Sequence, residues 1–207
     1  MHADDYYSIK SEGTAELIVK GSRFIAHACP VGTKEEAEAV IRKIAAKFHD
    51  ATHNCFAYKI GTGDQADFRF SDDGEPSGTA GKPIFQAIET KDLTNLAVVV
   101  TRYFGGTKLG TGGLIRAYSG VALQALNSAT VIKHFVKGNL RLEFDYEFTN
   151  PVHHYLNKFH ADILDSTFDV KTTYIVSLKR RDEDAFKKEL LNASSGRINI
   201  KSQSFDD

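Results

Sequence analysis

The spacing of apolar residues changes from strand-like to helix-like within the first 50 residues. Residues 14–30 alternate apolar and polar positions, are rich in Val, Ile and Phe, and are interrupted by a Gly-Ser pair, which predicts a hairpin of two strands. Thr33 and Glu36 then have the spacing of a helical capping box, and the apolar residues that follow recur on one helical face as far as Phe48. We therefore expect a helix that begins after Thr33.

The next 85 residues or so continue this mixture of strands and helices. The pattern predicts a strand pair at 53–60 and 66–70 around the turn GTGDQ, a helix near 80–90, a strand at 96–103, a helix at 112–128 and a β-branched stretch at 130–136. The strand at 96–103 opens with an uninterrupted apolar run, which predicts that both of its faces are covered. The stretch between 71 and 83 has the Asp, Gly, Pro and Ser content of a loop.

From Gly138 the order of elements changes to strand, helix, strand, strand, helix, strand. This is the β-α-β-β-α-β order of a ferredoxin-like domain. Its first helix is expected over 150–161, with Asn150 as the cap and Pro151 at the first helical position. We therefore predict an α+β protein with two domains, residues 1–136 and 137–207.

Composition narrows the classes of function only a little. The chain has 26 basic and 27 acidic residues and a net charge of −1, so no excess of positive charge demands nucleic acid as a partner. Two cysteines are too few for a disulfide framework, the N-terminus lacks the layout of a secretory signal, and the longest apolar run has the length of a strand. We expect a cytoplasmic protein with no membrane partner and no disulfide-linked partner.

Charge is distributed unevenly around a glycine-rich segment at 101–120, TRYFGGTKLGTGGLIRAYSG. No carboxylate occurs between Asp92 and Glu143. The same window contains the cations Arg102, Lys108, Arg116, Lys133, Lys137 and Arg141. A buried strand that runs into a glycine-rich turn and then into a helix gathers free backbone N–H groups at the positive end of the helix dipole. This segment therefore predicts an anion site.

The helix after these glycines is apolar around most of its circumference and contains a single arginine, Arg116. We expect that arginine to need an anionic partner, from the protein or from a ligand. An acidic loop with Asp72, Asp73 and Glu75 lies upstream. Its carboxylates have two open interpretations, because they can pair with arginines in a structural network or hold Mg²⁺ beside a bound phosphate.

A second polar pair lies on the strand predicted at 53–60. His53 and Cys55 are two residues apart and share one face of the strand. A zinc site needs about four ligands in recognisable spacing, so a buried cysteine and a hydrogen-bonded histidine are the better interpretation. No metal site and no cofactor are predicted.

Four blocks of the chain resemble the IMPACT/YigZ family: KGSRFIAHACPV, HDATHNCFAYKI, FSDDGEPSGTAGKPI and VVVTRYFGGTKLGTGGLIRAYSGV. The resemblance extends over essentially the whole chain. It implies an N-terminal domain similar to the second domain of ribosomal protein five of the small subunit, a mixed sheet with helices on one face. It also implies a C-terminal domain similar to domain V of elongation factor G. Eukaryotic relatives are linked to translation control through a domain with no counterpart in these residues.

The most specific family block locates the candidate site, and its aromatic pair is suited to stacking on a base. The site residues are Arg102, Tyr103, Phe104, Gly105, Gly106, Lys108, Gly110, Gly112, Gly113 and Arg116. We interpret the chain as a translation-linked regulatory or binding protein, rather than an enzyme, that contacts RNA, the ribosome or a translation factor. The alternatives are an Mg²⁺-dependent phosphoryl- or nucleotide-processing enzyme and a protein-interaction scaffold whose charge clusters are purely structural.

Overall fold

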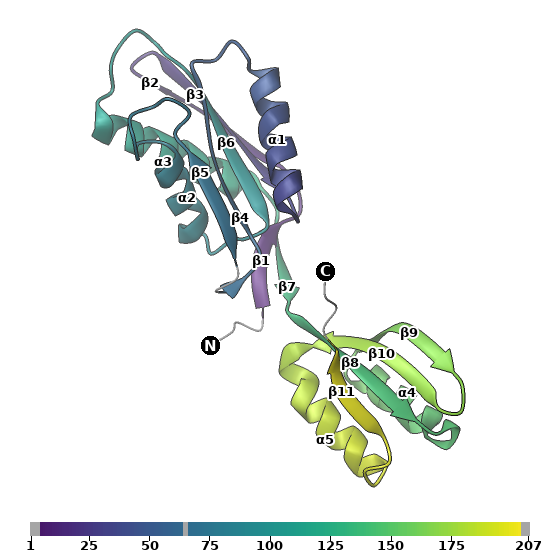
Figure 1. Cartoon of the computed structure of the whole chain (residues 1–207). Coiled ribbons are helices and arrows are strands. Elements are labelled where there is room, and N and C mark those ends of the chain that lie inside the picture. Colours follow the sequence, from purple (N-terminus) through teal and green to yellow (C-terminus); the bar gives the residue numbers. More distant parts are fainter. Residues whose placement is uncertain (1–4, 64–65, 204–207) are drawn as a thin grey trace. The chain divides into compact units, whose positions relative to one another are not determined.

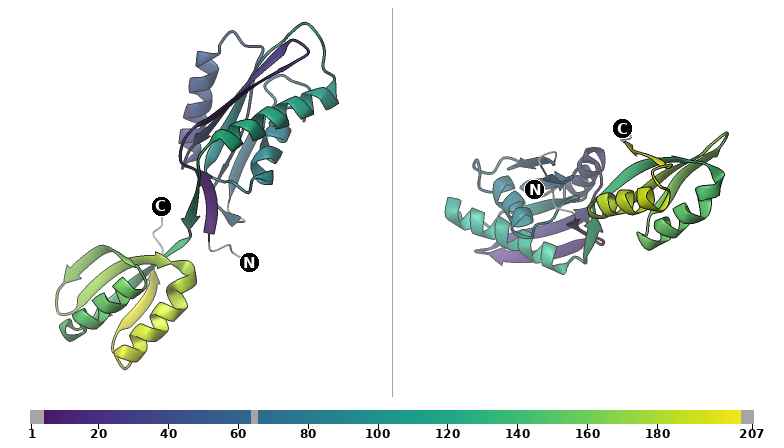
Figure 2. Two further views of the ribbon diagram at one scale, coloured as in Figure 1. Left: turned by 180° about the vertical axis from the view of Figure 1, so that it is seen from behind. Right: turned by 90° about the horizontal axis from the view of Figure 1, so that it is seen from below.

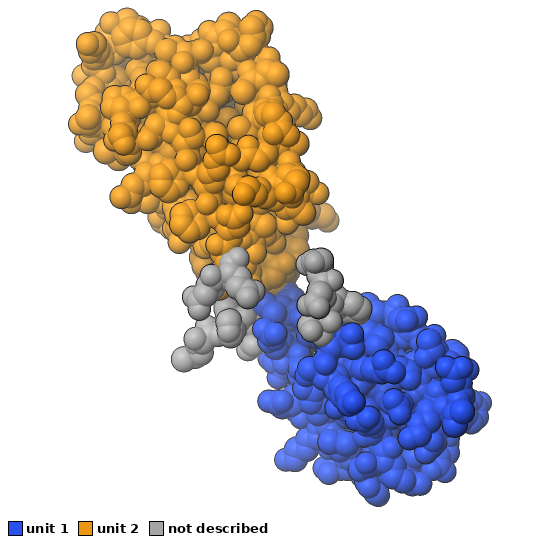
Figure 3. Space-filling model, in the orientation of Figure 1, with its two compact units in different colours: residues 1–5, 135–207 blue, residues 6–134 orange. Residues whose placement is uncertain are grey.

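The computed structural model describes residues 5–63 and 66–203, and the chain divides into two compact units (Figure 3). One unit comprises residues 6–134, and the other comprises residues 135–207 together with the start of the chain as far as Asp5. Two residues of the predicted turn GTGDQ, 64 and 65, lie outside the described residues, as do 204 and 205 of the last predicted strand.

The unit of residues 6–134 contains the elements predicted for it and one strand, β1, that was not predicted (Figure 1). They are β1 (Asp5–Ile9), β2 (Gly13–Val19), β3 (Ser22–Pro30), α1 (Lys34–Lys47), β4 (His53–Ile60), β5 (Asp67–Ser71), α2 (Gly81–Thr90), β6 (Leu96–Tyr103), α3 (Thr111–Ser128) and β7 (Val131–Phe135). The predicted cap of α1 is confirmed, because the side chain of Thr33 accepts a hydrogen bond from the backbone N–H of Glu36 at 3.2 Å.

Five strands of this unit form one sheet in the order β2-β3-β6-β4-β5, and every pairing in it is antiparallel. The α+β class is confirmed, but the expected mixed sheet with helices on one face is wrong in both details. One apolar cluster packs α2 and α3 against one face, and a second packs α1 against the other (Figure 2). The physical reason lies in β6, whose apolar run offers side chains to both faces and is buried throughout from Leu96 to Arg102.

The unit of residues 135–207 has the predicted order β-α-β-β-α-β. Its elements are β8 (Lys137–Phe144), α4 (Thr149–Lys158), β9 (Asp162–Phe168), β10 (Thr172–Lys179), α5 (Glu183–Ala193) and β11 (Asn199–Gln203). They form an antiparallel sheet in the order β11-β8-β10-β9, with its apolar face packed against the two helices. The specific likenesses to the ribosomal protein and to elongation factor G remain predictions.

The first helix in this unit begins two residues before the predicted first helical position, Pro151, and ends three residues before the predicted end. Helix α4 begins at Thr149, and Asn150 and Pro151 lie inside its first turn. A 3-10 turn over Tyr146–Phe148 leads directly into the helix and buries Phe148 in the core. That burial fixes the entry of the helix, so no cap is needed at Asn150. Within residues 5–63 and 66–203, no helix combines the length and the apolarity required to cross a bilayer.

His27 on β3 gives this fold a testable dependence on pH. Its Nε2 atom is buried and has no hydrogen-bond partner among residues 5–63 and 66–203, and its ring lies 5.6 Å from that of Phe48. Burial and the nearby Lys47 ammonium lower the pKa of His27, while Glu12 acts in the opposite direction. The unfolded chain therefore takes up a proton at this residue at a higher pH than the folded protein does. Stability is retained above the ordinary histidine pKa and lost as pH falls toward the lowered value.

We expect His27→Gln to flatten the pH dependence of the free energy of unfolding between about pH 5 and 8. Urea unfolding of the wild type and the variant across that range measures the difference in slope. His49→Gln is the matched control, because His49 follows the end of α1 and is exposed to solvent. Parallel pH profiles for wild type and His27→Gln would show that the buried ring has no linkage to folding.

Candidate functional site

The register of the five-stranded sheet sets three side chains in one row. Arg102 on β6 pairs with Phe24 on β3 and with His53 on β4. Directly paired residues of antiparallel strands project from the same face, and Phe24 belongs to the core beneath α2 and α3. Arg102, the charged residue of β6, therefore lies beneath α2 and α3, and it is only 5% exposed.

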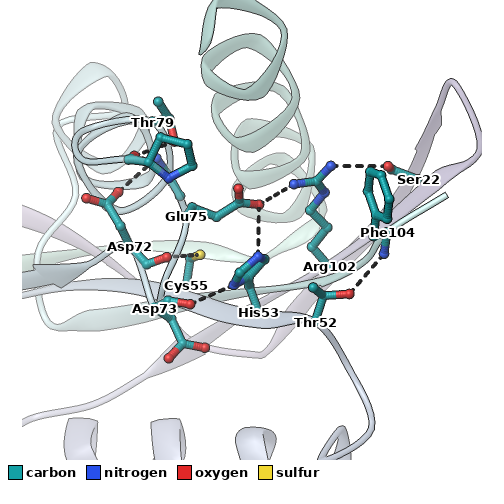
Figure 4. Close-up of polar contacts among 12 residues, drawn as sticks. Ser22, Thr52, His53, Cys55, Asp72, Asp73, Glu75, Thr79, Arg102 and Phe104 are labelled. Carbon is teal, nitrogen blue, oxygen red and sulfur yellow. Dashed lines mark hydrogen bonds and ion pairs between the residues drawn. The ribbon is translucent and has the colours of Figure 1, made fainter. Parts of the chain in front are cut away.

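A buried ion pair neutralises this arginine (Figure 4). The Nη1 atom of Arg102 donates to Oε1 of Glu75 at 2.5 Å, and Nη2 donates to Oγ of Ser22 at 3.3 Å. The guanidinium carbon lies 5.4 Å from the ring centre of Phe24 and 5.5 Å from that of Phe104. The arginine is thus held by hydrogen bonds at its tip and lies within cation–π distance of two aromatic rings.

Glu75 connects the acidic loop to all the surrounding elements. Besides the bond from Arg102, its Oε1 atom accepts a hydrogen bond from the hydroxyl of Tyr118 at 2.7 Å and lies 3.9 Å from Nε2 of His53. The Nδ1 atom of His53 lies 2.7 Å from the carbonyl oxygen of Asp73, which can only accept, so Nδ1 carries a proton. Loop, sheet and α3 therefore meet at one carboxylate.

The three predicted carboxylates of the acidic loop do not converge on a common point. Asp72 accepts hydrogen bonds from the backbone N–H groups of Gly78, Ala80 and Gly81 at 2.8–2.9 Å and so caps α2. Burial alone would raise the pKa of Asp72, but these donors outweigh it and the pKa is lowered. Asp73 accepts from the backbone of Asn54 at 2.6 Å.

The structural interpretation of the acidic loop is thus the one that the contacts support. Each carboxylate has protein donors of its own, and the described residues contain no group of three His, Cys, Asp or Glu side chains placed to hold a metal ion. Asp72, Asp73 and Glu75 therefore do not form the assembled set of Mg²⁺ ligands that the alternative requires.

Cys55 lies beside this network without the character of a nucleophile. Its Sγ atom is 2.9 Å from the carbonyl oxygen of Asp72 and 3.4 Å from the hydroxyl oxygen of Tyr118. Burial raises the pKa of the Cys55 thiol to about 12. The thiol is therefore protonated at neutral pH, as expected for a buried structural cysteine.

Glycines of the glycine-rich segment allow two separate structural features, a close backbone contact and an uncapped helix start. Gly105 lies directly against the β2–β3 turn, where a Cβ atom on it would be 1.9 Å from the carbonyl carbon of Gly21. Gly110 stands at the N-cap of α3 with φ 72°, and no side chain caps the helix. Gly105 thus allows backbone contact between two loops, and Gly110 leaves the N-terminus of an 18-residue helix without a side-chain cap.

That open N-terminus borders a pocket of about 380 Å³. Its lining includes the charged or titratable residues His53, Glu75, Arg102 and Lys108, together with Phe104 and Gly110. Phe104 is 48% exposed, and its backbone N–H donates to Oγ1 of Thr52 at 3.1 Å. The pocket therefore combines an exposed ring, one exposed lysine and the positive end of a helix dipole.

The structure does not bring all the predicted residues to this pocket. Tyr103 lies on the opposite face of β6 from Arg102, and its hydroxyl donates to Asp50 at 2.8 Å. Arg116 is exposed one turn into α3, outside the pocket lining, and makes no ion pair with any described residue. The expected anionic partner of Arg116 is therefore not supplied by the described residues, because this side of α3 faces solvent and its neighbour Ile115 is also 40% exposed, and a partner from a ligand remains a prediction.

Sequence reasoning missed two residues of the site, Ser22 and Tyr118. Both are polar groups within apolar patterns, and neither has a local signal that separates it from an ordinary strand or helix residue. The blocks KGSRF and LIRAYSG contain them, so the family resemblance was the one available signal.

Comparison with known proteins agrees with the two-domain fold. Residues 20–126 match the family model of the Impact N-terminal domain, and residues 142–197 match that of a domain of unknown function, DUF1949. The IMPACT family member YvyE of Bacillus subtilis is 34% identical over 95% of this chain and 90% of its own length. YigZ of Escherichia coli is 32% identical over 88% of this chain and 90% of its own length.

A solved structure described as a hypothetical protein superposes with a TM-score of 0.71 at 29% identity, covering 99% of this chain and 100% of its own. The Impact N-terminal match includes the whole of the pocket, from Thr52 to Leu114. The family-specific glycine block therefore coincides with the uncapped start of α3. The chain belongs to the IMPACT/YigZ family.

Proposed function

We propose that this protein is a translation-linked binding protein whose pocket at the glycine-rich loop binds RNA through a phosphate group. The observation that carries the proposal is the uncapped N-terminus of α3, which opens into the pocket between Lys108 and Phe104. Backbone N–H groups at a helix N-terminus and an exposed lysine suit a phosphate, and an exposed ring suits a base.

The charge of the pocket supports an anionic ligand. Arg102 and Glu75 neutralise each other, so the pocket's remaining positive charge comes from Lys108 and the helix end. The chain as a whole is nearly neutral, with a net charge of −1. Affinity therefore depends on this one site and on shape rather than on a broad basic surface. The family resemblance to proteins of translation control favours RNA or a ribosomal component as the source of the phosphate.

We expect Lys108→Ala to weaken binding of single-stranded RNA and to reduce the slope of log affinity against log salt by about 1, because one phosphate contact is lost. Fluorescence anisotropy with a labelled oligoribonucleotide at several salt concentrations measures both quantities. Lys43→Ala is the matched control, since Lys43 is an exposed lysine of α1 on the opposite face of the sheet. An unchanged slope for Lys108→Ala in a folded protein contradicts the proposal.

A further inference from the structure

One oxygen of the Glu75 carboxylate is used inside the protein, and the other is free. Oε1 receives the hydrogen bonds from Arg102 and Tyr118, whereas no described residue donates to Oε2. The side chain of Glu75 is only 3% exposed, yet the residue lines the pocket. Figure 4 shows the two oxygens diverging, with one directed at Arg102 and His53. Oε2 is not among the fully buried unpartnered atoms of the described residues, so it is accessible from the pocket and can accept a hydrogen bond from a ligand.

A second acceptor lies next to Glu75. Nδ1 of His53 donates to the carbonyl oxygen of Asp73, so in the tautomer with its single proton on Nδ1 the ring presents Nε2 as an acceptor. His53 lines the same pocket, and its Nε2 atom is 3.9 Å from Oε1 of Glu75. This side of the pocket therefore offers two acceptors, Oε2 of Glu75 and Nε2 of His53, next to the guanidinium of Arg102, whose Nε has no partner among the described residues.

The apolar part of the pocket lies between these two polar ends. Phe104 is half-exposed, and Leu109 and Leu114 contribute to the same lining. The volume of about 380 Å³ falls within the usual range of small-molecule sites. The ligand that fits is flat and apolar in the middle, donates hydrogen bonds at one end and is negatively charged at the other.

We propose that the pocket binds a guanine nucleotide of single-stranded RNA, with the N–H edge of the base at Glu75 and His53. Guanine offers two adjacent donors, N1–H and the N2 amino group, to the two acceptors. The base stacks on Phe104, and the phosphate lies at Lys108 and the N-terminus of α3. This inference rests on the RNA binding proposed above and adds base selectivity to it.

The test measures binding of the wild-type protein to labelled oligouridylates that contain a single guanosine, inosine, adenosine or cytidine. We expect guanosine to bind at least about fivefold more tightly than adenosine or cytidine. Inosine, which lacks the N2 amino group, is expected to fall between them. Equal affinity for all four oligonucleotides overturns the base selectivity but leaves the proposed RNA binding intact. Absence of binding to every oligonucleotide overturns both.

Glu75→Gln provides the matching change in the protein. A glutamine retains a carbonyl oxygen for Arg102 and Tyr118 and replaces the free acceptor by a donor. We expect this variant to lose the preference for guanosine while still binding oligouridylate. Glu16→Gln is the control, because Glu16 also accepts from an arginine, Arg23 at 2.8 Å, but lies outside the pocket. Retention of the guanosine preference in folded Glu75→Gln overturns the inference, and the wild-type series stands as a test if the variant does not fold.

Discussion

Replacing Arg102 by alanine is expected to lower the free energy of unfolding by about 3–5 kcal/mol, because it leaves the buried carboxylate of Glu75 without its cation. Both partners are almost fully buried, with side chains 6% and 3% exposed. The substitution also removes the packing of the guanidinium between Phe24 and Phe104. Urea unfolding at neutral pH, followed by circular dichroism, measures the change in stability.

Arg23→Ala is the matched control for this prediction. Arg23 also pairs with a glutamate from a neighbouring segment, but its ion pair with Glu16 is half-exposed, at 50% and 45%. Water screens such a pair and reduces its contribution to stability, so we expect a far smaller effect. Comparable losses of stability for Arg102→Ala and Arg23→Ala would show that burial does not distinguish the two pairs. A loss of RNA binding in Arg102→Ala is informative only when the protein is shown to be folded.

Gly105→Ala is expected to destabilise the protein by about 1–3 kcal/mol, toward the upper end of that range. A Cβ atom at this position would lie 1.9 Å from the carbonyl carbon of Gly21 and 2.2 Å from the backbone nitrogen of Ser22. Both neighbours are backbone atoms, which cannot rotate away as the end of a side chain can. The β2–β3 turn would therefore be displaced from the glycine-rich loop. Thermal and urea unfolding measure the cost.

Gly120→Ala tests whether glycine as such explains the effect. Gly120 lies inside α3, and a Cβ atom there would meet nothing within 4 Å. Alanine has a higher helix propensity than glycine and reduces the entropy of the unfolded chain, so we expect a gain of about 0.5–1 kcal/mol. A loss of stability in Gly120→Ala similar to that in Gly105→Ala would rule out the close backbone contact as the cause.

The order and type of most helices and strands could be predicted from the sequence because capping and periodicity depend on residues close together in the chain. The alternation before Gly21 and the capping pair of Thr33 and Glu36 act within a few residues of the elements that they define. The start of α4 differs by two residues from the predicted one for the opposite reason. Its entry depends on burial of Phe148 in a core built from strands far away in the sequence.

The candidate site was predicted less completely than the fold. The glycine block correctly pointed to the junction of β6 and α3, and Lys108 and Phe104 do line a pocket there. The sequence could not rank its three cations, because each stands beside apolar residues and none has a local carboxylate. Arg116 was expected to be partnered and is exposed, whereas Arg102 is the one that is buried.

By itself the sequence determined the two-domain α+β organisation, the identity of the elements apart from β1, and the segment that contains the site. Periodicity, caps and glycine-rich turns act through the nearest residues, so a linear pattern is sufficient to predict them. The tertiary structure alone decided which groups meet. Strand register places Arg102 between Phe24 and His53, and chain folding brings Glu75 to it from 27 residues away. The burial of that ion pair and the free oxygen of Glu75 arise from those long-range contacts, which no local pattern encodes.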